Sequence, residues 1–217
     1  MSSAASGPSD PGAILDLDRR RRLGMVEAVW GEHKSAAQIA AIAAELLTAQ
    51  ETVLVTRVSP AKAEAVLAGL DRLAGLSALE PQGRLEAGSL TYHPAAACLS
   101  SSLPEPSALS GRVAVLGGGS SDLTVASEAQ LALRCHGVPS ELLLDVGVAG
   151  LHRLLERLDQ LRSARVLIAC AGMEGALPTV LAGLLPQPVI AVPVSVGYGV
   201  SSGGVAALHG MLASCAP

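Results

Sequence analysis

The sequence predicts an α/β protein whose second half forms a doubly wound parallel sheet. Two short aliphatic runs, 166–169 and 189–192, each stop at small residues, and the segment 175–184 between them has helical composition. Apolar runs of this length without polar alternation are typical of parallel strands buried on both faces. Strands that alternate with helices in this way predict right-handed crossovers in one sheet.

The remaining elements of the second half follow the same alternation. Small or polar residues follow each apolar run, and leucines recur at helical spacing between the second and third runs. We expect strands at 113–116, 141–146, 166–169 and 189–192, and helices at 123–135, 150–162, 175–184 and 203–213.

The first half predicts a smaller α/β module over residues 14–99. Ser35 is placed to cap a helix that runs to about residue 49, and Ser59 and Pro60 are placed to begin another that ends near residue 70. Further elements are a helix from 15 to about 29 and strands at 52–56 and 89–93.

Two segments outside these modules have the composition of loops. Residues 1–13 show no apolar periodicity, which predicts a disordered leader. Residues 100–111 are rich in Ser and Pro, which predicts a linker before a second domain at 112–217.

Composition excludes several classes of protein. The 217 residues have a net charge of −4, which argues against a general nucleic-acid-binding surface, and the four arginines at 19–22 are expected to form a solvated helix face. Aromatic residues make up 1% and Phe is absent, so the core is expected to consist of Ala, Val, Leu and Ile.

Cysteine spacing and proline content bear on location. The four cysteines are far apart and form no metal-binding pattern, so we expect free thiols, no metal site built by the chain, and a cytoplasmic location. Prolines divide the apolar C-terminal third into pieces shorter than a membrane span, so no membrane segment is expected.

The best candidates for chemistry follow the third and fourth strands. Glu174 is the last acidic residue of the chain and lies beside Gly172 and Met173. In parallel sheets, ligands bind outside the carboxyl ends of the strands, which makes this carboxylate a functional candidate; a helix N-terminal Glu stabilised by the dipole is the equal alternative. The stretch after the fourth strand supplies further candidate substrate-binding residues: Ser195, Gly197, Gly203 and Gly204.

A glycine and serine loop follows the first strand of this domain. Three glycines allow close backbone approach, and free amides with hydroxyls at a helix start bind an anion, so the loop is a candidate phosphate site. A simple capped turn is the alternative, and Asp122 either contacts a ribose or caps the helix. The candidate residues are Gly118, Gly119, Ser120, Ser121 and Asp122.

Two further candidates have weaker support from spacing alone. His152 and Arg153 fall in the first turn of the helix after the second strand, where Arg153 is either a bidentate phosphate donor or a solvated residue. Cys215 lies at the end of the last helix, where a lone thiol is usually inert.

Several motifs together resemble a known family. GGGSSD, AGMEGALP, PVIAVPV and GGVAALHGML resemble the aminoimidazole ribonucleotide carboxylase (PurE-like) superfamily over 112–217. Over 14–217 the chain is closer to one branch of it, the pyridinium-3,5-biscarboxylic acid mononucleotide synthases of nickel-pincer cofactor biosynthesis. The matching segments are LDLDRRRRLGMVEAVWGEHKS, VTRVSPAKAEAV, TYHPAA, LDVGVAGLHRLL, VPVSVGYGVSSGG and MLASCA.

The resemblance implies a flavodoxin-like fold and a reaction. Members of that branch carboxylate the pyridinium ring of nicotinic acid adenine dinucleotide with CO2 and release AMP. By resemblance, Cys215 is the nucleophile that adds to the ring and Glu174 is the acid/base. Family likeness also implies Mg²⁺, no tightly bound organic cofactor, and a homo-oligomer, an octamer. The C-terminal stretch 175–217, which contains no Asp, Glu, Lys or Arg, independently suggests burial against other subunits.

Departures from the family pattern keep two alternatives open. Gly119 stands where purine carboxylases have Ser, and Glu174 where they have His, which favours the pyridinium branch over a purine-biosynthesis carboxylase or mutase. Ala97 stands where relatives tend to have Arg, and the sequence stops two residues after Cys215. These features suggest the second alternative, an inactive truncated paralogue that binds nucleotide or joins an oligomer.

Overall fold

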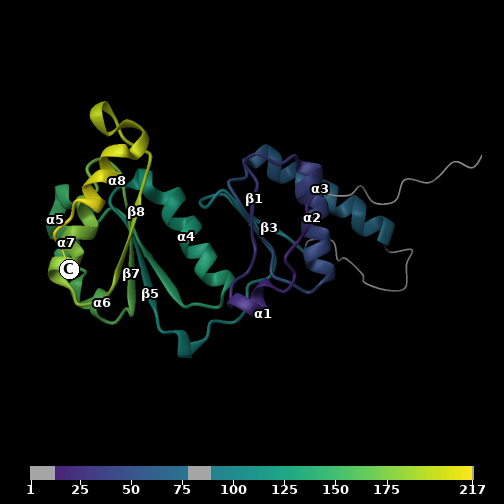
Figure 1. The fold of residues 1–217 in the computed structure, drawn as a ribbon, viewed down its shortest axis with the longest axis horizontal. Coiled ribbons are helices and arrows are strands. Elements are labelled where there is room, and N and C mark those ends of the chain that lie inside the picture. The colour runs from purple at the N-terminus through teal and green to yellow at the C-terminus, as the bar shows by residue number, and fades with distance from the viewer. Residues whose placement is uncertain (1–12, 78–88, 217) are drawn as a thin grey trace, which may run out of the picture. The chain divides into compact units, whose positions relative to one another are not determined.

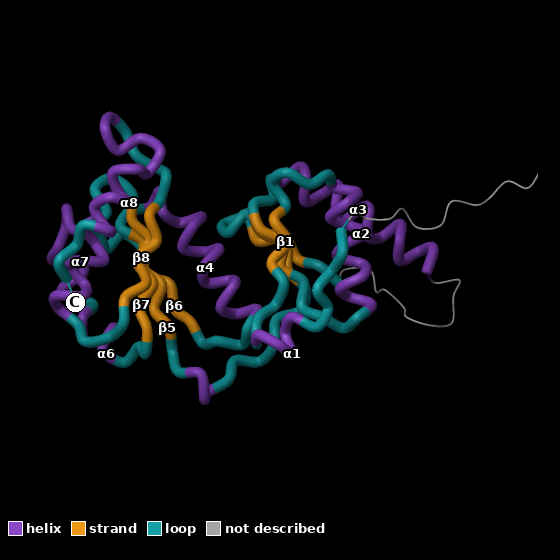
Figure 2. Tube along the Cα trace, viewed as in Figure 1, coloured by secondary structure: helices purple, strands orange, loops and turns teal. Residues whose placement is uncertain are grey.

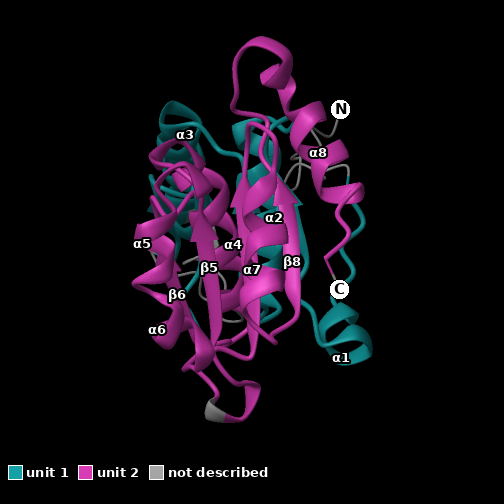
Figure 3. Cartoon of the chain, turned by 90° about the vertical axis from the view of Figure 1, so that its left-hand side faces the viewer, with its two compact units in different colours: residues 1–103 teal, residues 104–217 magenta. Residues whose placement is uncertain are grey.

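The computed structural model describes residues 13–77 and 89–216, and the chain divides into two units, residues 1–103 and 104–217 (Figure 3). The leader predicted over 1–13 lies, except for Ala13, outside the described residues. Each unit has its own sheet and its own core.

The second unit contains the predicted parallel sheet. Its four strands lie in the order β6-β5-β7-β8, and every neighbouring pair is parallel. The strands are β5 (Val113–Gly117), β6 (Ser140–Leu143), β7 (Val166–Ala171) and β8 (Val189–Pro193). The helices are α4 (Leu123–Cys135), α5 (Leu151–Leu155), α6 (Leu158–Arg162), α7 (Ala176–Leu184) and α8 (Val205–Leu212), with short 3₁₀ turns η1 (Ala108–Ser110), η2 (Ser120–Asp122), η3 (Val148–Gly150) and η4 (Gly199–Gly204).

Helices cover both faces of this sheet, so the doubly wound architecture is confirmed. Helix α4 lies on one face, and α5, α6 and α7 lie on the other (Figure 1). The alternation of side chains along β5 explains the two layers: Leu116 packs into the cluster that contains Leu154, Leu161 and Leu181, whereas Val115 packs into the cluster on the α4 side.

Two predictions in this unit were wrong. The helix predicted over 150–162 is broken at 156–157 into α5 and α6, and the break leaves Leu154 and Leu161 both fully buried. Strand β8 was predicted to be buried on both faces, but it is the last strand of the sheet and Ile190 is 53% exposed. Side chains of a strand point to the two faces of the sheet, and the described residues leave the face of β8 that carries Ile190 partly uncovered.

The first unit has a mixed four-stranded sheet in the order β1-β2-β4-β3. In Figure 2 its strands are the orange segments around the label β1. Strands β1 (Ala28–Trp30) and β2 (Leu54–Thr56) are parallel, and β4 (Cys98–Ser100) is antiparallel to both β2 and β3 (Thr91–His93). Helices α2 (Ala36–Thr48) and α3 (Pro60–Ser77) contribute most of the core of this unit. The Ser35 cap is confirmed as a full capping box with Gln38.

The prediction of a helix over 15–29 was also wrong, because only part of this segment is helical. The helical part is α1 (Arg19–Leu23), which ends at Gly24 in the left-handed conformation with φ of 67°, and the following residues form β1. Pairing with β2 in the register Val29 to Val55 explains why this segment is a strand. Strand β4 was not predicted, and α3 continues beyond residue 70 to Ser77.

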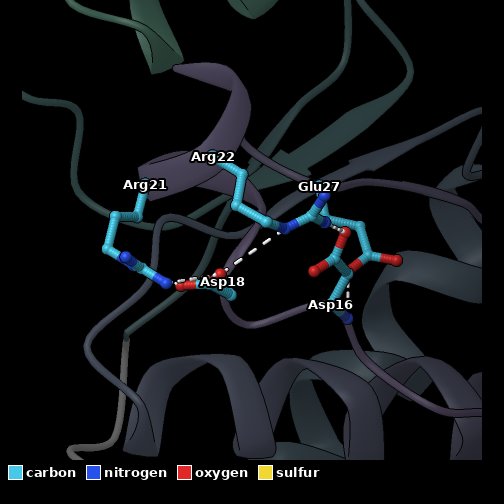
Figure 4. A network of polar contacts seen from close by, with 5 residues as sticks. All are labelled: Asp16, Asp18, Arg21, Arg22 and Glu27. Atoms are coloured by element: carbon cyan, nitrogen blue, oxygen red, sulfur yellow. Dashed lines mark hydrogen bonds and ion pairs between the residues drawn. The ribbon is translucent and has the colours of Figure 1, made fainter.

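The arginine run on α1 is held by acidic residues close to it in sequence. Arg21 forms a bidentate contact with Asp18, with the Nε–Oδ1 distance at 2.6 Å, and Arg22 pairs with Asp16 (Figure 4). The backbone amide of Asp16 donates to Glu27 at 2.9 Å. Because these arginines are paired with carboxylates at an exposed surface, their arrangement agrees with a solvated face.

Within the described ranges, no helix combines the length and apolar character that crossing a bilayer requires.

Candidate functional site

A cavity of about 290 Å³ lies at the carboxyl ends of the strands in the second unit. The loops that follow β5, β6, β7 and β8 all contribute to its wall, as expected for a parallel sheet with helices on both faces. Its lining residues are Gly118, Gly119, Ser121, Asp122, Gly147, Val148, Ala149, Ala171, Gly172, Met173, Glu174, Ala176, Leu177, Val196, Gly197 and Tyr198.

The loop after β5 is shaped by close contacts between backbones. A Cβ atom on Gly147 would lie 2.4 Å from the carbonyl oxygen of Gly118, so the loop after β6 approaches this one more closely than a side chain allows. Asp122 is 4% exposed, and its Oδ2 accepts a hydrogen bond of 2.8 Å from the backbone amide of Gly119. This contact closes the 3₁₀ turn η2, and the Asp122 side chain makes no capping hydrogen bond to helix α4, which begins at the next residue.

Burial has an electrostatic consequence for Asp122. Desolvation raises the pKa of its carboxyl above the ordinary value, and hydrogen bonds from the amides of Gly119 and Gly118 offset part of that rise. The cavity floor therefore holds a carboxylate whose charge is destabilised by its surroundings.

Glu174 lies in the tight turn between β7 and α7. The backbone amide of Gly175 donates to the carbonyl oxygen of Gly172 at 3.0 Å, and the residues on either side of Glu174 are left-handed, with φ of 53° at Met173 and 70° at Gly175. A non-glycine residue in this region is uncommon and is often found at functional sites. The Glu174 side chain is exposed and borders the cavity.

This turn is in close backbone contact with two other segments, the loop after β8 and helix α8. A Cβ on Gly172 would lie 2.2 Å from the carbonyl oxygen of Val196, and a Cβ on Gly210 in α8 would lie 2.1 Å from that of Glu174. The glycines at these positions let the turn, the loop after β8 and helix α8 pack backbone to backbone. They fix the position of Glu174 from both sides.

About half of the predicted site residues meet at the cavity. Those that line it are Gly118, Gly119, Ser121, Asp122, Gly172, Met173, Glu174 and Gly197. The others do not: Ser120, His152, Arg153, Ser195, Gly203, Gly204 and Cys215.

Contacts within the chain explain several of these positions. Arg153 pairs with Asp145, which itself has a left-handed φ of 59°, and His152 is exposed. Gly204 packs against Ser195, since a Cβ there would lie 2.9 Å from the Ser195 Cα. None of these residues forms part of the cavity wall.

Cys215 is not brought to Glu174 within one chain. It follows the end of α8, is exposed, and does not line the cavity. In Figure 1 the C-terminus lies on the side of the sheet that carries α6 and α7. Ser214 accepts a hydrogen bond of 2.8 Å from the hydroxyl of Thr179 on α7 and so ties the segment beside Cys215 to that helix.

The other cysteines are poor nucleophiles. All four cysteines lie in the described part of the chain, and among them Cys98, Cys135 and Cys170 are buried. Burial raises the pKa of Cys135 to about 11 and that of Cys170 to about 12. Because the thiolate is the reactive form, Cys215 is the thiol best placed to react with a solute.

Sequence reasoning missed two parts of the wall. Gly147, Val148 and Ala149 follow β6, whose end was predicted three residues too late; they fell in the short loop before the predicted helix and were not named as candidates. Tyr198 lines the cavity and is 78% exposed. Tyr198 is one of two tyrosines in a chain with 1% aromatic residues, and it lies in the loop after a predicted strand. That combination could have identified it as a candidate site residue.

Two acidic side chains bear on where the Mg²⁺ implied by family resemblance would bind. Among residues 13–77 and 89–216, no three His, Cys, Asp or Glu side chains gather to hold a metal ion. One oxygen of Asp122 already accepts a hydrogen bond from Gly119. Mg²⁺ in proteins is commonly held by one or two carboxylates together with oxygen atoms of the substrate, and the carboxylates that line the cavity are those of Asp122 and Glu174.

The close backbone contacts of the turn at 172–175 predict that alanine has different effects on stability at two glycine positions. Gly172→Ala should lower the free energy of unfolding by about 1–3 kcal/mol, because the new Cβ collides with the Val196 carbonyl. Gly183→Ala on α7, where no atom lies within 4 Å, should leave stability unchanged or raise it by up to about 1 kcal/mol. Denaturant unfolding followed by circular dichroism checks both, and a Gly172→Ala variant as stable as wild type would contradict the close approach.

The raised pKa of Asp122 predicts a pH dependence of stability. An acid whose folded-state pKa is raised disfavours the folded state as pH rises from its ordinary value of about 4 through the raised value. Asp122→Asn keeps an oxygen for the Gly119 amide but does not titrate. Its free energy of unfolding, relative to wild type, should therefore increase as urea titrations move from pH 4 to pH 7. A relative decrease over that range would show that the ionised carboxylate is stabilised instead.

Comparison with known proteins agrees with this geometry. Residues 11–100 match the family described as the LarB/PurE-like N-terminal domain, and residues 112–217 match the AIR carboxylase family. An uncharacterized protein of Methanocaldococcus jannaschii is 44% identical over 109 residues, which cover 49% of this chain and 41% of that protein. The N5-carboxyaminoimidazole ribonucleotide mutase of the same organism is 41% identical over 85 residues, which cover 38% of this chain and 52% of that enzyme.

The chain thus spans about half the length, or less, of these two relatives. The two family matches together extend over most of its own length and meet near the boundary between the structural units. The chain joins a LarB/PurE-like N-terminal domain to an AIR carboxylase domain, and it belongs to the PurE-like superfamily as a LarB-type member.

Proposed function

We propose that the chain is a carboxylase and hydrolase: it adds CO2 to the pyridinium ring of nicotinic acid adenine dinucleotide and uses water to cleave the phosphoanhydride and release AMP, with the cavity of the second unit as the active site. The observation that supports this best is the charge of the wall. Among the described residues that line the cavity, the ionisable acids are Asp122 and Glu174, and no Lys, Arg or His takes part. A pyridinium ring is a cation, and a wall with carboxylates and no basic side chain suits it electrostatically.

The phosphates of such a substrate would bind at the loop after β5. The Ser121 hydroxyl is exposed at the cavity, and the loop leads through η2 into α4, whose dipole favours an anion at its start. Two loop amides are already engaged: that of Gly119 donates to Asp122, and that of Gly118 donates to the carbonyl oxygen of Cys170 at 3.1 Å. Anion binding therefore depends on the remaining polar groups of the loop.

Glu174 would be the acid/base. Carboxylation requires a ring proton to be removed after the new C–C bond forms, and general base catalysis depends on a group held near that proton. The turn that contains Glu174 is fixed between the loop after β8 and α8, while its carboxylate faces the cavity edge. This combination of a rigid backbone and an accessible carboxylate fits proton transfer.

Cys215 would be the nucleophile. Its thiolate adds to a ring carbon, the resulting enamine carbon attacks CO2, a base removes the ring proton, and expulsion of the thiolate restores the aromatic ring. Since Cys215 is exposed and does not line the cavity of its own chain, this role requires either a movement of the C-terminal segment or the cavity of a second copy.

A second copy has an apolar surface available to it. Strand β8 is the edge of the sheet, and exposed apolar side chains gather on it and on α8: Ile190, Val205, Leu208 and Leu212. The sequence from 175 to 217 contains no Asp, Glu, Lys or Arg to make this surface favourable in water. We therefore propose that the chain forms a homo-oligomer through this surface, defined by those four residues.

A purine-type reaction is the second candidate, because a named relative is a mutase that acts on a carboxylated aminoimidazole ribonucleotide. Parallel incubations with nicotinic acid adenine dinucleotide or with aminoimidazole ribonucleotide, each with ¹³C-bicarbonate and Mg²⁺ and read by mass spectrometry, distinguish the two reactions. We expect a labelled pyridinium product and AMP. Labelled product only from aminoimidazole ribonucleotide would favour the purine reaction instead.

The same assay tests Glu174. Glu174→Gln should slow carboxylation about 100-fold or more while dinucleotide binding, measured by calorimetry, is retained. The matched control is Glu156→Gln, another exposed glutamate of the same unit that does not line the cavity; it should react as wild type does. Equal loss in both variants would remove Glu174 from the mechanism.

Mixed oligomers test where Cys215 acts. Cys215→Ser and Glu174→Gln chains should each be inactive alone. If the thiol serves the cavity of a second copy, co-expressing them should restore part of the activity, because some cavities then combine an intact Glu174 with an intact Cys215. Light scattering that shows a monomer at micromolar concentration would contradict this arrangement, and so would full activity in Cys215→Ser.

A further inference from the structure

A second polar cluster lies in the first unit, at the carboxyl ends of the parallel strands β1 and β2. The segments after these strands, WGEHK (30–34) and TRVSP (56–60), lie side by side there, since the amide of Gly31 donates to the carbonyl oxygen of Thr56 at 2.9 Å. A Cβ on Gly31 would lie 2.9 Å from that same oxygen, so glycine permits the approach. None of these residues lines the cavity of the second unit.

Trp30 is the aromatic residue of this cluster. Its side chain is 50% exposed, although burial of an indole is strongly favourable. The ring meets His33 in an edge-to-face contact, with centroids 4.7 Å apart and planes at 80°, and its Nε1 donates to a Glu32 oxygen at 3.2 Å. Two neighbours thus orient the indole while half of its surface stays in contact with solvent.

Arg57 is the first cation of the cluster. Its Nη1 donates at 3.4 Å to the same Glu32 oxygen that accepts from Trp30, and the side chain is 62% exposed. Its backbone is left-handed, with φ of 55°, which is uncommon for a residue with a side chain. The next residue is anchored on both sides: the Val58 amide donates to Ala97 at 2.7 Å, and its carbonyl accepts from the Tyr92 hydroxyl at 3.0 Å.

Lys62 is the second cation. It lies in the first turn of the 18-residue helix α3, and its ammonium donates to the carbonyl oxygens of Gly31 and Glu32, both at 2.9 Å. An ammonium has three donors, so one is left for a further acceptor. The positive end of the α3 dipole is at the same edge.

We propose that this cluster is a binding site for a nucleoside phosphate, with the base on the exposed face of Trp30 and the phosphate beside Arg57 and Lys62. An oriented, half-exposed indole offers a surface on which a heterocycle stacks irrespective of its identity. A guanidinium and an ammonium next to it supply charge-assisted hydrogen bonds to phosphate oxygens. Glu32 is the one carboxylate in these contacts, and it is engaged by the indole and by Arg57, so the cations outnumber it.

The experiment uses Trp30 itself, because it is the only tryptophan of the chain. We expect AMP, titrated into the full chain, to change Trp30 emission with saturation. Arg57→Gln should weaken AMP binding at least tenfold, whereas Arg72→Gln, an exposed arginine further along α3, should leave it unchanged. Adenosine and ribose 5-phosphate should each bind at least tenfold more weakly than AMP, since each lacks one of the two groups that the cluster recognises.

Three results would overturn the proposal, provided that circular dichroism shows a folded chain. They are the absence of a saturable change at millimolar AMP, an equal affinity in Arg57→Gln, and an equal affinity for adenosine. An AMP signal that survives Arg57→Gln would place binding outside this cluster. The carboxylation assay with Glu174→Gln is independent of this titration, so the two proposals fail separately.

Discussion

The candidate site depends on backbone contacts that leave no room for a side chain. The turn 172–175 lies between the carbonyl oxygen of Val196 and helix α8, and glycines at 172, 175 and 210 make both contacts sterically possible. Met173 has a left-handed conformation, which costs a non-glycine residue about 1–3 kcal/mol. The contacts on both sides of the turn hold the residue in this conformation in spite of that cost. The same restraint determines where the carboxylate of Glu174 lies. The glycines thus allow the backbone contacts that hold the turn, and the turn places the Glu174 carboxylate at the cavity.

The second unit could be predicted closely because its strands are buried and local signals agree. The Val113–Gly117 strand is buried throughout, and α4 begins and ends where the sequence indicated. The failures come from tertiary context. Residues 28–30 become a strand because β2 is available to pair with them, and the face of β8 that carries Ile190 is left partly uncovered by the described residues. A sequence pattern records neither which strand will be a neighbour nor which face of a strand will be covered.

The site was predictable to the extent that it consists of loops after strands. Glu174, Asp122 and their glycine neighbours meet because parallel strands end at one edge of the sheet. Arg153 and Cys215 were not positioned by that rule, since each lies on or after a helix. Arg153 is held by Asp145, and Cys215 follows α8 away from the cavity. Family resemblance identified the thiol, but the fold of a single chain does not place it next to Glu174.

The central claim is that the cavity in the second unit binds a pyridinium dinucleotide through the loops after β5, β7 and β8. Hydrogen–deuterium exchange of the full chain, with and without nicotinic acid adenine dinucleotide, tests it most directly. The account predicts slower exchange in 117–122, 172–175 and 194–204, with no comparable change along the exposed side of α4. Protection that is confined to residues outside these loops, or no protection at a dinucleotide concentration that saturates binding, would contradict it.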